Sequence, residues 1–328
     1  MNQIPNTFGI KVSADALVEY DSVEELRSLI LAGSIRPPFL NVGQGSNFVF
    51  TSDFHGTVLH SAIDDFEVVY EDAKSVTVRA GAGIVWDDFV EECVSRGWYG
   101  VENLSLIPGQ VGAAAVQNIG AYGVEVKDVI TAVAAVDLTD GDVIVFSNVD
   151  CGYAYRNSIF KRPENKKYVI TSVYFRLSLV EEYSLSYAGL RDIQDPSLRK
   201  VREEVIRIRR EKLPDPSEVG SAGSFFMNPV VSVDRFSELQ REYPSIPHYP
   251  ASGSNGDPCV KLAAGWLIEQ CGWKGRSVGP VGVWEKQALV LVNRGGASGA
   301  DVMRMASDII SSVKEKFDIS LKMEAEIL

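Results

Sequence analysis

Apolar residues recur at helical spacing in five parts of this chain, and each part predicts a helix. Ser22, followed three residues later by Glu25, is typical of a helix N-terminus and places the start of the first helix. The segment 261–271 predicts another helix, and the remaining four have one apolar face that we expect to be buried. These inward-facing residues are Val23, Leu26, Leu29 and Ile30; Trp86, Phe89, Val90 and Cys93; Leu198, Val201, Val205 and Ile208; and Val302, Met305, Ile309 and Val313.

Short apolar runs predict strands at 38–42, 48–50, 75–80, 130–137, 143–146, 168–177 and 288–293. Asp140 and Gly141 separate two of these runs and are typical of a hairpin turn. The chain from 317 to 327 alternates strictly between apolar and polar residues, which predicts a half-buried strand. Its polar face ends in Glu324 and Glu326, and a solvated strand face explains that pattern equally well. Strands, helices and a hairpin in this mixture favour an α+β fold.

Glycine punctuates the stretch 106–125, at Gly109, Gly112, Gly120 and Gly123. Most residues between them are Ala and Val, so the composition suits neither an ordinary helix nor an ordinary strand. Main chain with few bulky side chains can approach a flat or charged ligand closely. A glycine-rich turn that joins two core elements is the alternative.

A second glycine-containing turn, 43–47 (GQGSN), lies between two predicted strands. A Rossmann fingerprint requires a helix after the glycines and a third glycine where Phe48 stands, so this turn does not belong to that class. Its amide groups are still suited to binding a phosphate.

The composition of the 328 residues is that of a globular protein with two or three domains, because 45% are hydrophobic and 23% are charged. The formal net charge of −12 argues against nucleic acid or an anionic membrane as the main partner. An anionic substrate therefore requires a local cluster of Lys and Arg.

Four cysteines without a CxxC pair, and only three histidines, indicate neither a disulfide framework nor a metal site. The first residues, MNQIPNTFGIKV, lack the features of a signal peptide, and no apolar run approaches the length of a membrane span. We expect a cytoplasmic protein that works on small molecules and is a monomer.

Several segments together resemble one known family. IPGQVGAAAVQNIGAYGVE (107–125), YRNS (155–158), GSFFMNP (223–229) and MEAE (323–326) occur in an order that is similar to the UDP-N-acetylenolpyruvoylglucosamine reductases. The resemblance extends from NTFGI near the start of the chain to MEAE near its end. It implies two FAD-binding subdomains of the vanillyl-alcohol-oxidase (PCMH-like) fold, at 1–70 and 71–213, and a substrate-binding α+β domain at 214–328.

The resemblance also implies the reaction. Members of this family use NADPH and FAD to reduce UDP-N-acetylglucosamine-enolpyruvate to UDP-N-acetylmuramate, a precursor of the bacterial cell wall. It implies three catalytic residues: Arg156 to stabilise negative charge on the substrate, Ser224 as proton donor and Glu326 as an assisting carboxylate. A serine is a poor acid at neutral pH, so this role requires suitable neighbours and a basic reaction partner.

The remaining site residues follow from the same resemblance. Those expected to contact FAD are Gly43, Gly45, Ser46, Asn47, Ile107, Pro108, Gly109, Gly112, Ala113, Gln117, Asn118, Gly120, Ala121, Tyr122, Gly123 and Arg209. Those expected to bind the sugar nucleotide are Tyr155, Tyr187, Lys212, Asn228, Tyr249, Lys261 and Gln287, with Tyr187 on a lid loop that defines one subtype of the family.

Two positions depart from the family pattern. Met227 stands where a Lys is common, and the chain ends in AEIL where PEVR is expected. Two alternatives therefore stay open. One is a different FAD-dependent oxidoreductase of the same fold that acts on a sugar or an alcohol, and the other is a flavin or sugar-nucleotide binder without enzymatic activity.

Overall fold

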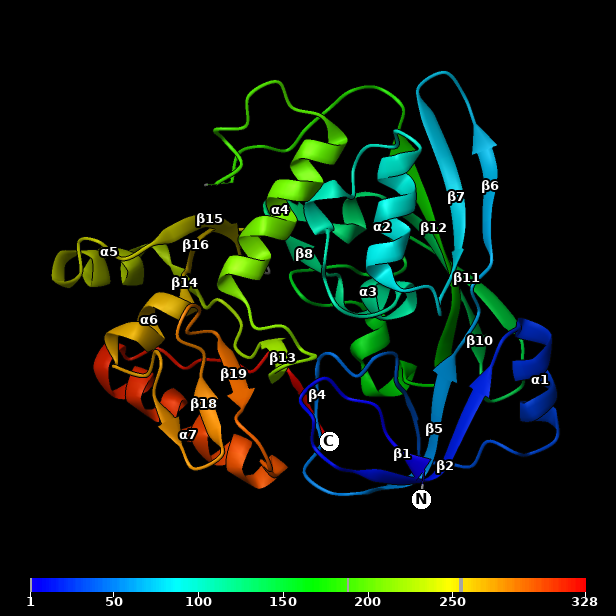
Figure 1. The fold of residues 1–328 in the computed structure, drawn as a ribbon, viewed down its shortest axis with the longest axis horizontal. Helices are drawn as coiled ribbons and strands as arrows, with labels where there is room; N and C mark the ends of the chain where they lie inside the picture. The colour runs from blue at the N-terminus through cyan, green and yellow to red at the C-terminus, as the bar shows by residue number, and fades with distance from the viewer. Residues whose placement is uncertain (1, 188, 254–255) are drawn as a thin grey trace. The chain divides into compact units, whose positions relative to one another are not determined.

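The computed structural model of this protein describes residues 2–187, 189–253 and 256–328 (Figure 1). The chain forms two compact units, each assembled from segments that are far apart in the sequence. The first unit contains Met1–Pro5, Ser13–Gly45 and Phe54–Arg210, and the second contains Asn6–Val12, Ser46–Asp53 and Glu211–Leu328.

The first unit contains two sheets and a small hairpin. A four-stranded sheet has the order β1-β2-β5-β3, and a five-stranded antiparallel sheet has the order β11-β10-β12-β7-β6. Their strands are β1 (Asn2–Gln3), β2 (Ser13–Tyr20), β3 (Phe39–Asn41), β5 (Phe54–Ser61), β6 (Phe66–Glu71), β7 (Ser75–Gly81), β10 (Ile130–Asp137), β11 (Val143–Ser147) and β12 (Tyr168–Ser178), and the hairpin pairs β8 (Gly120–Ala121) with β9 (Val124–Glu125).

The helices of this unit are α1 (Val23–Leu31), α2 (Trp86–Ser95), α3 (Val111–Gln117) and α4 (Leu198–Lys212), whose last two residues belong to the second unit, together with four short 3-10 helices: η1 (Glu102–Leu104), η2 (Val126–Asp128), η3 (Ile159–Lys161) and η4 (Pro163–Asn165). Figure 1 shows α2 and α3 against the strands of the larger sheet, where Trp86, Phe89 and Phe175 share one core.

Most local signals in this unit are confirmed, although Leu26 is the only one of the four predicted inward residues of α1 that is fully buried. Ser22 accepts a hydrogen bond from the Glu25 amide at the start of α1, while the Glu25 carboxylate accepts one from Asp21 rather than from Ser22. The predicted hairpin is formed by β10 and β11, and Gly141 in its loop has a φ of +80°, which glycine adopts readily. All four predicted inward residues of α2 are buried, as are those of α4.

One buried arginine ties α4 to α2. Arg202, 7% exposed, donates two hydrogen bonds to the Asp87 carboxylate, at 2.7 and 3.0 Å, and one to Glu91 at 2.5 Å. Burial raises the pKa of the Asp87 carboxyl, but the bonds from Arg202 and from the Leu106 amide outweigh this effect and lower the pKa overall. Asp87 therefore also holds the beginning of the glycine-rich stretch.

The second unit has a sheet of order β13-β19-β18-β17 and a sheet of order β14-β16-β15, and β20 pairs with β4 in parallel. Its strands are β4 (Phe48–Val49), β13 (Gly220–Ser224), β14 (Val230–Ser232), β15 (His248–Ser252), β16 (Pro258–Leu262), β17 (Ser277–Val278), β18 (Val281–Val283), β19 (Val290–Asn293) and β20 (Glu326–Ile327), and its helices are α5 (Val233–Glu242), α6 (Ala264–Gln270) and α7 (Gly299–Phe317). The four predicted inward residues of α7 are buried.

Two predictions for this unit are wrong in part. The helix expected at 261–271 begins only at Ala264. Lys261 belongs to β16 instead, because this strand pairs with β15 as far as Leu262 and the helix starts after it. A terminal strand was expected at 317–327, but Phe317 ends α7, Met323 forms only an isolated bridge, and the strand itself is Glu326–Ile327. Ile319, Leu321 and Ala325 are nevertheless buried as the alternation requires.

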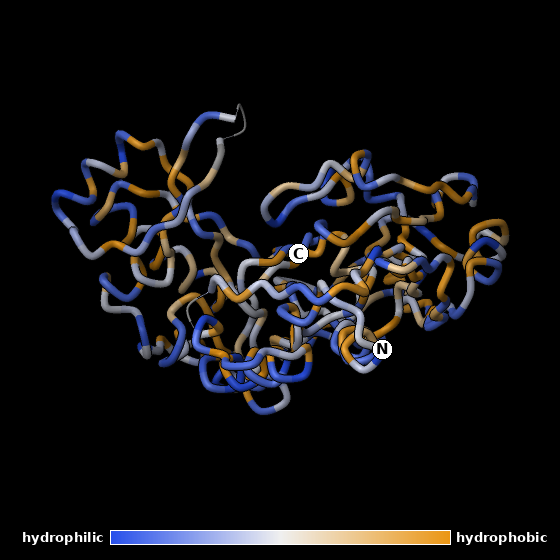
Figure 2. Tube along the Cα trace, turned by 90° about the horizontal axis from the view of Figure 1, so that it is seen from above, coloured by the Kyte–Doolittle hydropathy of each residue, from blue (hydrophilic) through white to orange (hydrophobic). Residues whose placement is uncertain are grey.

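Hydrophobic stretches of the chain are short and interrupted by hydrophilic positions, as the colours in Figure 2 show. Accordingly, no helix among the described residues is long and apolar enough to cross a membrane.

We predict that Arg202→Met lowers the free energy of unfolding by about 3 kcal/mol, because it leaves the Asp87 carboxylate partly buried without its partner. Arg199→Met is the control, since Arg199 is exposed and reaches Glu91 only at 3.7 Å, and it should cost less than about 1 kcal/mol. Urea denaturation measures both. The difference in the free energy of unfolding between wild type and Arg202→Met should persist above about pH 4 and disappear as Asp87 becomes protonated at lower pH. Equal effects of the two variants would contradict this role.

Candidate functional site

The glycine-rich stretch contains a short helix, α3, which the sequence did not predict. Backbone hydrogen bonds fix its beginning against the chain that follows β7: the amides of Val111 and Gly112 donate to the carbonyls of Ile84 and Ala82, and the Trp86 amide donates to the carbonyl of Gly109. The segment is therefore held by its own main chain. Its exposed residues Pro108, Ala113 and Gly123 have small side chains.

Gly112 is required by packing inside this unit. A Cβ atom at this position would lie 2.9 Å from the Cβ of Ala82, closer than real Cβ atoms approach one another. The Gly112 amide is also engaged, with the carbonyl of Ala82 at 3.0 Å. The absence of a side chain here lets α3 lie against the end of β7.

Two glutamines that the sequence analysis did not single out support this stretch. The Gln44 Oε1 atom accepts a hydrogen bond from the Gly109 amide at 2.9 Å, which joins the 43–47 turn to the glycine-rich stretch. Gln110 donates to the carbonyl of Gly83 at 2.8 Å. Sequence alone carries little signal for such contacts, because the partners lie 65 and 27 residues away.

Arg156 occupies an unusual backbone conformation. Ala154 and Asn157 exchange two backbone hydrogen bonds, so Tyr155 and Arg156 form the two-residue loop between them. Arg156 has a φ of +53°, in the left-handed region where turns of this kind ordinarily take Gly or Asn. A side chain in this region costs about 1 kcal/mol. Strain of this kind is typical of functional residues.

The guanidinium of Arg156 lies against the end of the glycine-rich stretch. It donates to the carbonyl of Gly120 at 2.5 Å and to that of Asn118 at 3.4 Å. A Cβ at Gly120 would lie 3.0 Å from Arg156 Nη1, so glycine provides the space for the guanidinium. Asn118, itself at φ +48°, bonds to the carbonyl of Ala154 and thereby joins the helix end to the Arg156 turn.

Arg209 and Tyr122 form a second polar group in this unit. Arg209 donates to the carbonyl of Leu106 at 3.2 Å. Burial lowers the pKa of its guanidinium, and the neighbouring Tyr122 offsets this effect only in part. Tyr122 also meets the ring of Tyr187 edge-on, with centroids 5.0 Å apart. Asn103 donates to the carbonyls of both Tyr122 and Ser184, which ties the loop before Tyr187 to the glycine-rich stretch.

In the second unit, the last residues of the chain run beside the end of the 43–47 turn. The Glu326 amide donates to the carbonyl of Asn47 at 2.8 Å, and the Asn47 side chain donates to the carbonyl of Glu324 at 3.2 Å. The carbonyl of Leu328 accepts two hydrogen bonds from Thr51. These bonds hold Glu326 firmly although it lies two residues from the end.

Ser224 is the last residue of β13 and precedes two buried phenylalanines, Phe225 and Phe226. The carbonyl of Phe225 accepts a hydrogen bond from the Glu324 amide at 2.8 Å, and Phe226 forms a bridge with Met323. The residues just after Ser224 therefore lie beside the residues just before Glu326, although β13 and β20 belong to different sheets.

The residues expected to bind the sugar nucleotide gather partly on one sheet. Tyr249 of β15 and Lys261 of β16 are direct partners across the strands, so their side chains share a face, and Tyr249 is 46% exposed. The Asn228 side chain instead accepts a hydrogen bond from the Ala264 amide at the start of α6. Gln287 lies beside Gly265 of the same helix, and Lys212 is exposed.

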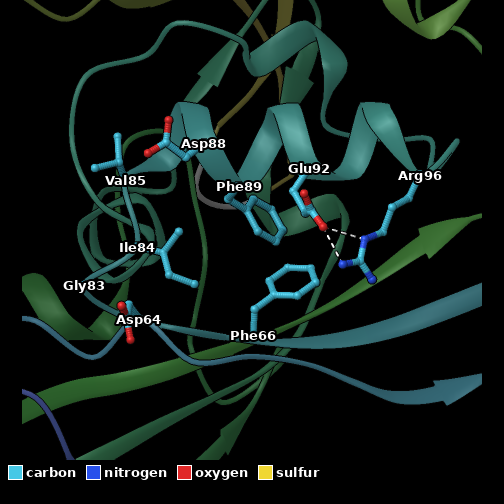
Figure 3. A pocket seen from close by; sticks show the side chains of 9 residues that line it. All are labelled: Asp64, Phe66, Gly83, Ile84, Val85, Asp88, Phe89, Glu92 and Arg96. Atoms are coloured by element: carbon cyan, nitrogen blue, oxygen red, sulfur yellow. Dashed lines mark hydrogen bonds and ion pairs between the residues drawn. The ribbon is translucent and has the colours of Figure 1, made fainter.

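A surface hollow of about 520 Å³ lies elsewhere in the first unit, between α2 and β6 (Figure 3). Its lining is Asp64, Phe66, Gly83, Ile84, Val85, Asp88, Phe89, Glu92 and Arg96, which includes none of the predicted site residues. The one arginine is already bonded to Glu92 at 2.6 Å, and the other charged residues are acidic. This hollow does not suit an anionic ligand.

The first unit fits FAD on its own chemistry. Small exposed residues along 107–123 leave main chain that a planar ring system can approach, and Arg209 supplies a cation suited to a phosphate. Among the described residues there is no group of three or more His, Cys, Asp and Glu side chains that could hold a metal ion.

Comparisons with known proteins agree with this arrangement. Residues 14–147 match an FAD-binding domain, and residues 215–328 match the C-terminal domain of UDP-N-acetylenolpyruvoylglucosamine reductase. Both matches fit the mixed α+β fold, which was predicted and is confirmed.

Relatives with this reductase name cover almost the whole chain. The chain is 54% identical to the protein from Bacteroides fragilis (strain YCH46), covering 98% of this chain and 97% of that protein, and 49% identical to the one from Porphyromonas gingivalis (strain ATCC BAA-308 / W83), covering 98% and 96%. The crystal structure of the reductase from Thermus caldophilus matches with a TM-score of 0.65 at 25% identity, covering 98% of this chain and 95% of that one.

We predict that Arg156→Gly is more stable than Arg156→Ala, with a free energy of unfolding about 1 kcal/mol higher. Both variants lose the guanidinium, and they differ in the Cβ atom at a φ that only glycine adopts without strain. Urea denaturation of the pair measures the difference. A more stable alanine variant would show that the left-handed conformation is not maintained in solution.

Proposed function

Because this chain belongs to the UDP-N-acetylenolpyruvoylglucosamine reductase family, we propose that it reduces UDP-N-acetylglucosamine-enolpyruvate to UDP-N-acetylmuramate with NADPH. The identity of 54% over almost the whole chain is the basis for the family. The observation that carries the chemistry is the arginine at φ +53°, whose guanidinium lies on the glycine-rich stretch. An anion-stabilising residue held at a conformational cost is suited to a reaction that builds negative charge on a carboxylate.

FAD is held, in this proposal, by main chain of the 43–47 turn and of the stretch 107–123, with Arg209 near a phosphate. Bound there, FAD would supply hydride-transfer chemistry between NADPH and the methylene carbon of the enol ether. The match to an FAD-binding domain at 14–147 supports this assignment.

Arg156 acts on the substrate carboxylate. As the new C–H bond forms at the methylene carbon, the C=C π bond breaks and its electron pair moves onto the neighbouring carbon and the carboxylate. The fixed guanidinium stabilises that charge through charge-assisted hydrogen bonds. Because it is already held by two carbonyls, little reorganisation is required during the reaction.

Ser224 donates the proton to the carbon next to the carboxylate, and Glu326 assists. The carbon that accepts the proton is strongly basic. A weak acid such as serine can therefore protonate it. The contacts of Phe225 with Glu324 and of Phe226 with Met323 bring the two segments together and support a joint role. The proposal requires both to act on the same substrate as Arg156.

The sugar nucleotide is bound by Tyr155, Lys212, Asn228, Tyr249, Lys261 and Gln287, with Tyr187 on a lid. The pairing of exposed Tyr249 with half-buried Lys261 supports a phosphate contact, in which a cation and a hydroxyl share one face. Asn228 also has a structural role, because its side chain accepts a hydrogen bond from the Ala264 amide at the start of α6. Met227 contributes no charge here.

The proposal places this reaction in the cytoplasm and treats the enzyme as a monomer of three parts, 1–70, 71–213 and 214–328. NADPH binds in the substrate cleft and leaves before the sugar nucleotide enters.

We predict that Ser224→Ala separates the two halves of the reaction. Under anaerobic conditions NADPH should bleach the flavin at nearly the wild-type rate, because the hydroxyl is not needed before the substrate enters. Reoxidation by the enolpyruvyl substrate should slow by about 10² to 10⁴, the size of a lost general acid, with little change in substrate affinity. Stopped-flow absorbance times each half separately.

Ser221→Ala is the control, because Ser221 lies on the same strand and is buried. It should leave both halves near their wild-type rates. Unchanged reoxidation in Ser224→Ala would remove this serine from the mechanism, whereas equal slowing of both halves would indicate a disturbed flavin site.

A further inference from the structure

We propose that Lys161 is a positioning residue that fixes Arg156 and the end of α3 for the reduction of the substrate. This inference rests on the proposed function, since it concerns the arginine assigned to the substrate carboxylate. Lys161 belongs to none of the motifs that identified the family, and its place emerges from the contacts of its ammonium group.

The Lys161 ammonium connects two segments. Its Nζ atom donates to the Gln117 Oε1 atom at 2.6 Å and to the backbone carbonyl of Arg156 at 3.4 Å. Gln117 is the last residue of α3, and Arg156 is the strained residue of the 154–157 turn. One cation therefore holds the end of the helix and the turn at the same time.

The short helix η3 gives Lys161 a fixed base. Ser158, the residue before η3, donates to the carbonyl of Val116 in α3 at 2.7 Å, and the Ile159 amide donates to the carbonyl of Cys151 at 2.9 Å. The backbone from which Lys161 extends is thus tied to α3 independently of the lysine. Loss of the ammonium should release the Arg156 turn without detaching η3.

Removing the ammonium should affect one step. The Arg156 turn would lose a charge-assisted bond that opposes its backbone strain, and the guanidinium would spend less time in the reactive position. Partners that orient metal ligands typically contribute 10- to 100-fold to activity, and we expect an effect of similar size for a partner that orients Arg156. We expect that loss in the reoxidation of reduced flavin by the enolpyruvyl substrate, because only this half uses Arg156.

The test compares three variants of the full-length holoenzyme in both half-reactions: Lys161→Met, Lys161→Arg and Lys74→Met. Lys161→Met keeps the length of the side chain and removes its charge, and Lys161→Arg restores a donor cation. Lys74 is exposed in the same unit, so Lys74→Met is the matched control for losing one charge. Flavin content and urea denaturation establish that each variant is intact.

Lys161→Met should bind FAD fully, accept a hydride from NADPH at the wild-type rate and reoxidise 10- to 100-fold more slowly, with KM changed less than threefold. Lys161→Arg should recover most of the lost rate, and Lys74→Met should match the wild type. An unchanged reoxidation rate in Lys161→Met, loss of its flavin, or failure of Lys161→Arg to recover the rate would overturn the proposal. Failure of the wild type to reduce the substrate would instead refute the proposed function itself.

Discussion

The main chain of the glycine-rich stretch must be fixed by hydrogen bonds while few side chains cover its surface. The carbonyls of Ala82 and Ile84 and the amide of Trp86 hold one side of it, and Asp87 holds its first residue. Glycine at 112 is required because Ala82 occupies the space of a side chain. In the proposed function, the same feature that allows close packing inside the unit leaves a smooth face for a planar cofactor.

The strained turn at Arg156 follows from this arrangement. Gly120 leaves room for the guanidinium, and the carbonyls at the end of α3 accept its hydrogen bonds, so the arginine is oriented by the glycine-rich stretch itself. The hydrogen bonds compensate for the left-handed backbone. If the proposed roles hold, cofactor binding and charge stabilisation both depend on this single segment, which would explain why the motifs 107–125 and 155–158 occur together.

Local signals predicted much of the fold. Trp86 and Phe89 identified α2, and Asp140 with Gly141 identified the hairpin, because helical spacing and turn preference depend only on residues that are close in sequence. Lys261 was misassigned to a helix, since the pairing of β16 with β14 and β15 comes from residues distant in sequence. The candidate site followed from the family motifs, whereas the supporting contacts of Gln44 and Lys161 depend on tertiary structure and leave no local pattern.

In the proposed function, reducing equivalents pass through a bound flavin to the enolpyruvyl group. A single turnover measures this most directly: the holoenzyme is reduced with one equivalent of NADPH without oxygen, and the enolpyruvyl sugar nucleotide is then added. We expect the flavin colour to return and one UDP-N-acetylmuramate, heavier than the substrate by two hydrogen atoms, to form for each flavin reoxidised. Return of the colour only after oxygen is admitted, with no change in the mass of the sugar nucleotide, would contradict it.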